Sequence, residues 1–106
     1  MTRAVVLTGG PGTGKSSVLQ ALTTLLDNDG VAHGAIECEQ LAWGTPWLPD
    51  ELAFEQLAAI CELQRGYGRE LFLVAATTET DEDLRGLIAA IGAERTFVAC
   101  LRASGS

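Results

Sequence analysis

A glycine-rich stretch near the N-terminus constrains this chain more than any other feature. Residues 9–16 read GGPGTGKS and match the pattern G-x-x-x-x-G-K-[ST] at every fixed position. Glycine accepts backbone angles that a Cβ atom forbids, so successive N–H groups in such a loop can point into one concavity and bind an anion. The stretch predicts a phosphate-binding loop, in which Lys15 reaches the β- and γ-phosphates of a nucleotide and the Ser16 hydroxyl coordinates Mg²⁺.

The residues on either side supply the context that this motif requires. The apolar run at residues 4–7 is typical of a short strand, and apolar residues from Val18 to Leu26 recur on one face of a helix. Strand, glycine loop and helix in this order form a phosphate-binding unit, and the helix, beginning at about Gly14, adds free N–H groups and the positive end of its dipole. The residues expected to contact the nucleotide are Gly9, Gly10, Pro11, Gly12, Thr13, Gly14, Lys15, Ser16 and Ser17.

Composition and charge exclude several classes of protein. The 106 residues suffice for one domain, spanning residues 1–106, and 47% hydrophobic with 20% charged residues indicates a globular chain. A net charge of -7 argues against nucleic acid or an anionic membrane as a partner, so phosphate binding must be a local effect of the loop and of Mg²⁺. The sequence shows no signal peptide and no apolar run of membrane-spanning length.

The cysteine and histidine content argues against a zinc site. Cys38, Cys61 and Cys100 lie far apart in apolar runs without a C-x-x-C pair, and His33 is the single histidine. We expect three reduced, buried thiols in a cytoplasmic protein. His33, at the start of a predicted strand, is expected to be structural rather than functional.

Strand and helix patterns alternate along the chain. They predict strands over 3–8, 31–38, 71–76 and 96–101, and helices over 14–29, 50–65 and 81–91. The unbroken apolar run at 71–76 is typical of a central strand that is buried on both faces. The alternation predicts a three-layer α/β/α fold with a mostly parallel sheet of about four strands. Glycine and proline residues predict loops over 41–49, and the tail from Arg102 to Ser106 is also expected to be a loop.

Two acidic residues, Glu37 and Glu39, come at the end of the second predicted strand. If the chain stays extended there, the two carboxylates face the same side, and ligands of parallel sheets bind beyond the carboxyl ends of the strands. Both residues are therefore candidate Mg²⁺ ligands together with Ser16, and Glu37 is also a candidate base for an incoming hydroxyl group. The spacing is equally compatible with two solvated loop acids.

Other polar and aromatic residues near the predicted strand ends have two interpretations each. Trp43 and Trp47 could line a pocket for an acceptor substrate, although packing of their loop against the next helix is the simpler role. Residues 77–79 occupy the place where nucleotide hydrolases hold Mg²⁺ with an aspartate, so either Glu79 or the earlier acids substitute or metal binding is weak. The acids at 81–83 are expected to cap a helix, with Thr80 as the N-cap, rather than to bind metal.

The loop at 9–16, the acids after the second strand and the strand–helix alternation resemble the P-loop small-molecule and nucleotide kinases, such as shikimate, gluconate, adenylylsulfate and nucleoside monophosphate kinases. The resemblance implies a parallel sheet between helices, ATP·Mg²⁺ as phosphoryl donor and an acceptor bound over the strand ends. In these kinases, acids at the positions of Glu37 and Glu39 contact Mg²⁺ or the acceptor. The kinases continue past the fourth strand into a lid with arginines and a last strand, which we expect this chain to lack.

Three functional hypotheses follow. The first is an ATP-binding kinase-like protein that transfers the γ-phosphoryl group to a small acceptor, with Lys15 and Glu37 as catalytic residues. The second is a module that binds ATP or GTP without chemistry. The third, a ring-forming ATPase, lacks support because residues 76–79 (ATTE) do not supply the acidic pair that it needs. The expected partners are a nucleoside triphosphate and a small acceptor, with self-association through an uncovered sheet edge as a further possibility.

Overall fold

The computed structural model describes residues 1–102, in which strands and helices alternate as expected. The elements are β1 (Arg3–Thr8), α1 (Lys15–Asn28), β2 (Gly34–Glu37), α2 (Glu39–Ala42), α3 (Asp50–Gly66), β3 (Leu71–Ala76), α4 (Asp81–Ile91) and β4 (Arg95–Cys100). Of the loop predicted for the C-terminal tail, residues 103–106 lie outside the described part of the chain.

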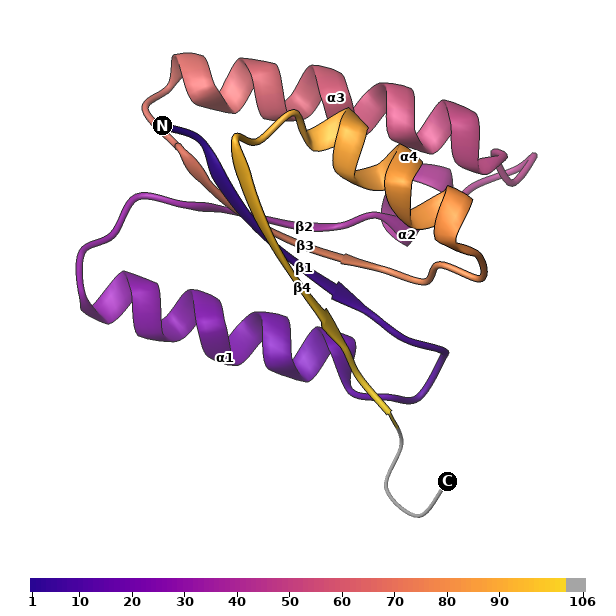
Figure 1. The fold of residues 1–106 in the computed structure, drawn as a ribbon, viewed down its shortest axis with the longest axis horizontal. Helices are drawn as coiled ribbons and strands as arrows, with labels where there is room; N and C mark the ends of the chain where they lie inside the picture. Colours follow the sequence, from indigo (N-terminus) through magenta and orange to yellow (C-terminus); the bar gives the residue numbers. More distant parts are fainter. Residues whose placement is uncertain (103–106) are drawn as a thin grey trace.

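The strands form one parallel sheet in the order β2-β3-β1-β4. Helix α1 covers one face of this sheet, and α3 and α4 lie side by side over the other (Figure 1). The three-layer α/β/α prediction is therefore confirmed. Because every strand runs the same way, the carboxyl ends of all four meet at one edge, which is the right-hand side of Figure 1.

The alternation of side chains along β3 divides the core into two parts. Phe72, Val74 and Ala76 point toward α3 and α4, where they pack with residues such as Leu57 and Leu87. Leu73 and Ala75 point the other way, toward α1. A strand that is apolar on both faces has to lie inside a sheet that is covered on both sides, and β3 does lie between β2 and β1 as predicted.

The second strand is shorter than predicted and the chain does not stay extended after it. β2 covers Gly34–Glu37 instead of residues 31–38. The preceding segment is held by α1 instead, through the Val31 N–H, which donates to the Leu26 carbonyl (2.9 Å), and through contact of the His33 ring with the Thr23 hydroxyl. His33 is thus a structural residue. After β2, Cys38 adopts a helical conformation and α2 begins at Glu39, where a loop was predicted from residue 41 onward.

The prediction of three buried thiols is correct for two of them. Burial raises the pKa of the Cys38 thiol and of the Cys61 thiol to about 11, so both stay protonated at neutral pH. Cys100 is exposed instead. It lies at the end of β4, an edge strand on which Phe97 also exposes 66% of its surface. The apolar run around Cys100 predicted that its side chain is buried. An edge strand pairs with one neighbouring strand instead of two, so its side chains are covered less.

Within residues 1–102, each helix is too short or too polar to cross a membrane.

The packing of the core predicts that two leucines on the same helix contribute unequally to the free energy of unfolding. Leu57 of α3 is fully buried between the helices and the sheet, whereas Leu63 exposes 60% of its surface. We expect Leu57→Ala to lower the free energy of unfolding by about 2 to 5 kcal/mol, because it removes buried methyl groups and leaves a cavity. Leu63→Ala should change it by less than about 0.5 kcal/mol. Urea unfolding followed by circular dichroism measures both, and equal losses would contradict this assignment of the core.

Candidate functional site

Three glycines of the loop between β1 and α1 have backbone angles that other residues avoid. Gly9, Gly12 and Gly14 have φ values of 145°, 77° and 89°. Gly9 is also crowded, since a Cβ atom there would lie 2.5 Å from the Leu101 carbonyl oxygen. The crowding arises because the chain beyond β4 continues to pair with β1, with the Leu101 N–H donating to the Thr8 carbonyl at 2.7 Å. The glycine pattern read from the sequence thus corresponds to a real conformational requirement.

The start of α1 faces this loop with its amide groups free of side-chain caps. Gly14 is the N-cap, and in the described structure no side chain accepts a hydrogen bond from the first turn, which also carries no acidic residue. Helix α4 is different, because its N-cap Thr80 accepts from the Asp83 N–H (3.0 Å) and three acids occupy its first turn. The prediction of Thr80 as the N-cap is confirmed, and of the three acids the Asp83 carboxylate accepts a backbone N–H, that of Glu79, at 3.3 Å. The first turn of α1 therefore retains N–H groups and a positive dipole end for an anion.

Lys15 lies over the loop that it is predicted to serve. Its ammonium group donates to the carbonyl oxygens of Gly9 (2.9 Å) and Gly10 (3.0 Å). The Thr13 hydroxyl donates to the Gly10 carbonyl (2.7 Å) and closes the loop on itself. The long side chain of Lys15 can turn its ammonium group toward a phosphate group. The backbone of the loop need not move when it does so.

Ser16 and Glu37 come together although 21 positions separate them. The Ser16 hydroxyl donates to one carboxylate oxygen of Glu37, and the Gln40 amide donates to the other at 2.9 Å. The sequence prediction brought Glu37 to the loop but missed Gln40. The first turn of α2 brings the Gln40 side chain back toward Glu37. Predicting a helix directly after β2 would therefore have revealed this contact from the sequence.

The expectation that Glu37 and Glu39 face the same side of an extended strand is wrong, because α2 begins at Glu39. One of its carboxylate oxygens accepts the Thr77 N–H at 2.6 Å, which fastens the start of α2 to the end of β3. Among the described residues, no group of three or more histidine, cysteine, aspartate and glutamate side chains has metal-binding geometry. The oxygen donors that the structure brings together are those of Ser16 and Glu37, with Glu39 lining the same cavity.

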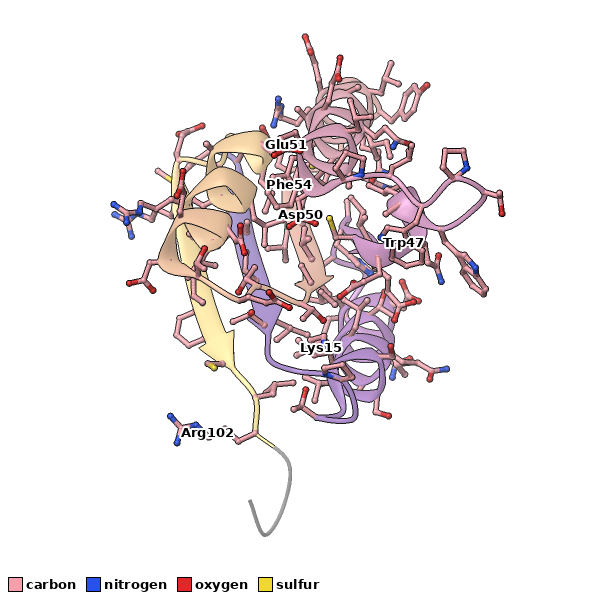
Figure 2. All side chains as sticks on the ribbon, turned by 90° about the vertical axis from the view of Figure 1, so that its right-hand side faces the viewer. Lys15, Trp47, Asp50, Glu51, Phe54 and Arg102 are labelled. Carbon is pink, nitrogen blue, oxygen red and sulfur yellow. The ribbon has the colours of Figure 1, made fainter. Side chains whose placement is uncertain are left out.

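Two neighbouring cavities, together called the cleft, lie at the carboxyl edge of the sheet between the loop and the start of α3. Its first part, a cavity of about 280 Å³, is lined by Pro11, Lys15, Ser16, Glu37, Glu39, Gln40, Ala75 and Thr77. Its second part, of about 40 Å³, is lined by Cys38, Glu39, Ala42, Trp47, Asp50, Ala53, Phe54, Ala76 and Thr77. Glu39 and Thr77 border both parts. Figure 2 looks onto this edge, with Lys15 below and Trp47, Asp50 and Phe54 above it.

The two tryptophans have different surroundings. Trp47 borders the second part of the cleft and exposes 60% of its surface, and Trp43 is 77% exposed without lining either part. Packing against α3, the simpler of the two roles, is therefore a poor description of Trp43. Trp47 lies where the alternative role, a wall of a substrate pocket, requires it to be.

Of the residues after β3, Thr77 lines the cleft, whereas Thr78 and Glu79 do not. The hydroxyl groups of Thr8 and Thr78 are hydrogen-bonded to each other at 2.6 Å, and both line a separate cavity of about 440 Å³ together with Glu79. Glu79 thus borders a different cavity from Ser16. Arg102 lies far from Lys15 and Trp47 in Figure 2 and points outward.

The fold is shared with solved structures of low sequence identity, whereas no protein-family model and no curated protein sequence matches the chain. The protein APE1195 is 18% identical with a TM-score of 0.69, over 97% of this chain and 62% of that one. The APS kinase CysC of Mycobacterium tuberculosis is 16% identical with a TM-score of 0.60, over 99% of this chain and 81% of that one. The C-terminal Sua5 domain of a Pyrococcus horikoshii Sua5 protein is 14% identical with a TM-score of 0.60, over 92% and 97%.

These likenesses concern the arrangement of the backbone. They confirm the predicted fold class, a P-loop-type α/β fold with a parallel sheet between helices, which this chain shares with an APS kinase. The chain spans less than two thirds of the length of APE1195. At 14 to 18% identity, these likenesses show the fold and not the roles of individual residues.

The crowding at Gly9 predicts a difference between neighbouring glycines. We expect Gly9→Ala to lower the melting temperature by several degrees and to disturb the loop, because the new methyl group meets the Leu101 carbonyl at a positive φ. Gly10→Ala should leave the melting temperature nearly unchanged, since a Cβ atom at Gly10 meets nothing within 4 Å. Thermal unfolding of the two variants measures this difference, and a tolerated Gly9→Ala would contradict the close approach of β4's end.

Proposed function

We propose that this protein binds ATP·Mg²⁺ at residues 9–16 and transfers the γ-phosphoryl group to a small acceptor bound in the adjoining cleft. The observation that carries the proposal is the uncapped start of α1 behind a loop of three positive-φ glycines, with Lys15 over the loop. Free amides, a helix dipole and an ammonium group are together complementary to a polyphosphate.

The residues beside the loop fit a magnesium ion. Mg²⁺ prefers oxygen ligands and keeps several of its waters, so a site needs only one or two protein oxygens next to the phosphates. The Ser16 hydroxyl and the Glu37 carboxylate, already in contact, supply such oxygens, and Glu39 is the further candidate. A bound Mg²⁺ would neutralise phosphate charge, which matters in a chain of net charge -7.

Glu37 is also placed to act on the acceptor. An acceptor hydroxyl oxygen forms a bond to the γ-phosphorus while the bond from that phosphorus to the β–γ bridging oxygen breaks, and the electron pair leaves with ADP. The hydroxyl proton passes to the Glu37 carboxylate, which borders the cavity where the acceptor would lie. Gln40 fixes the second carboxylate oxygen and so orients Glu37. Lys15 stabilises the charge that develops between the β and γ positions.

A second candidate function is nucleotide binding without transfer. Its support is that Glu39 is engaged by the Thr77 N–H and that, among residues 1–102, Lys15 is the one basic side chain that lines the cleft. The two functions differ in one measurement, the release of ADP in the presence of hydroxyl acceptors. Acceptor-dependent release supports transfer, and ATP binding with no release above background supports the binding module.

The first experiment compares the removal of two positive charges. Lys15→Ala should weaken ATP·Mg²⁺ binding at least about tenfold, because it removes a charge-assisted contact to the phosphates. Arg95→Ala removes the same charge at the start of β4, the opposite edge of the sheet, and should leave binding unchanged. Isothermal titration with ATP·Mg²⁺ measures both affinities. Equal affinity of the wild type and Lys15→Ala would rule out the proposed site.

A second experiment removes the charge of Glu37, on which both of its proposed roles depend. Glu37→Gln keeps the shape of the side chain and loses its charge, so transfer to an acceptor should fall about 100-fold, the usual contribution of a general base. Binding of ATP without Mg²⁺ should not weaken. Glu55→Gln on an exposed position of α3 is the matched control. If Glu37→Gln transfers phosphoryl groups at the wild-type rate, Glu37 is neither the base nor a metal ligand.

A further inference from the structure

The end of the cleft at Trp47 and Asp50 has a chemistry that the proposed function leaves unexplained. We propose that this end binds a protonated amine, so that the acceptor is an amino alcohol or amino sugar, with Asp50 and Trp47 as specificity-determining residues. The inference rests on the proposed function for its location, because the first part of the cleft holds Lys15 and Ser16 and the second part adjoins it through Glu39 and Thr77.

The size of the second part limits what enters it. A cavity of about 40 Å³ has room for about three water molecules by the same measure of volume. An ammonium group with its attached carbon fits such a space, whereas a phosphate group or a ring does not. The remainder of an acceptor would then occupy the larger part of about 280 Å³, where its hydroxyl group reaches Glu37.

The walls of the second part favour a cation. Trp47 and Phe54 supply aromatic surface beside the carboxylates of Glu39 and Asp50. Aromatic faces combined with carboxylates are complementary to ammonium groups, through cation–π attraction and charge-assisted hydrogen bonds. In Figure 2, Asp50 and Phe54 lie together at the start of α3, with Trp47 on the neighbouring loop, above the position of Lys15.

Several carboxylates act on Asp50, which is exposed at the start of α3. A carboxylate in the first turn of a helix is normally stabilised in its charged form by the dipole. Partial burial raises the pKa of Asp50 all the same, and the carboxylates of Asp83, Glu51, Glu79 and Glu39 raise it further. This crowd of like charges repels an anion and is relieved by a bound cation.

The positions of the basic residues exclude an anionic acceptor from this end. Among residues 1–102, the basic side chains other than Lys15 line neither part of the cleft. Arg3 and Arg95 lie side by side where β1 and β4 begin, at the opposite edge of the sheet, and Arg65 donates to the Ile91 carbonyl at 3.0 Å. An acceptor that bears a phosphate or carboxylate group would meet carboxylates without a basic partner.

Fluorescence of Trp47 tests the inference without ATP. Trp43→Phe leaves Trp47 as the single tryptophan of the chain. We expect a saturable change in its fluorescence with ethanolamine and glucosamine, and affinities at least about tenfold weaker for the matched neutral compounds, ethylene glycol and glucose. Equal responses to amine and neutral compounds, or a preference for the anions glycolate and gluconate, would overturn the proposal.

Substitution of Asp50 in the same background assigns the effect to this residue. Asp50→Asn keeps the size of the side chain and should weaken ethanolamine and glucosamine binding about tenfold, since a neutral amide forms a weaker bond to an ammonium group. Glu62→Gln removes a charge from an exposed position of α3 that does not line the cleft, and should have no effect. Unchanged amine affinity in Asp50→Asn would remove Asp50 from the site.

The outcome is separable from that of the proposed function. If ATP·Mg²⁺ fails to bind while amines bind at Trp47, the nucleotide proposal is wrong and the amine site stands. If ATP·Mg²⁺ binds in a Lys15-dependent way while amines leave the Trp47 fluorescence unchanged, the amine site is wrong and nucleotide binding stands.

Discussion

The parallel pairing of β1 with β3 on one side and β4 on the other is the interaction on which the rest of this structure depends. It places Thr8 at the carboxyl edge of the sheet, in register with Ala76 and Cys100, so the glycine loop begins where the paired backbone ends. The Leu101 N–H donates to the Thr8 carbonyl directly before the loop, and α1 begins directly after it. Gly9 follows from this crowding, whereas Gly12 and Gly14 are required by their positive φ values.

Charge is distributed unevenly along the carboxyl edge. The start of α1 is uncapped and bears Lys15, whereas the starts of α3 and α4 carry acids. One end of the cleft is therefore suited to an anion and the other to a cation, with Glu37 and Glu39 between them. In the proposed function, this distribution of charge would separate a donor with a polyphosphate tail from an acceptor with an ammonium group. In this chain of net charge -7, the groups suited to an anion are local and mostly backbone.

The expectations drawn from the sequence held where local patterns decide structure. The apolar run at 71–76 became the central strand, and Thr80 became the N-cap of α4, since both depend on neighbouring residues. The expectations failed where exposure or strand length depends on the position of a strand in the sheet and on its neighbours. Cys100 is apolar in sequence and exposed in space because β4 is an edge strand. β2 is shorter than its apolar run because the residues before it pair with α1 and those after it enter a helix.

By itself, the sequence determined the glycine-rich loop, the alternation of strands and helices, and the presence of acids near the loop. These are properties of short stretches, set by glycine conformation, apolar periodicity and capping. Only the tertiary structure decided that Gln40 orients Glu37, that Glu39 accepts the Thr77 N–H, and that Trp47 and Asp50 line one cleft with Lys15. These contacts depend on the helical turn at Cys38 and on the strand order, which bring together residues that no local pattern relates.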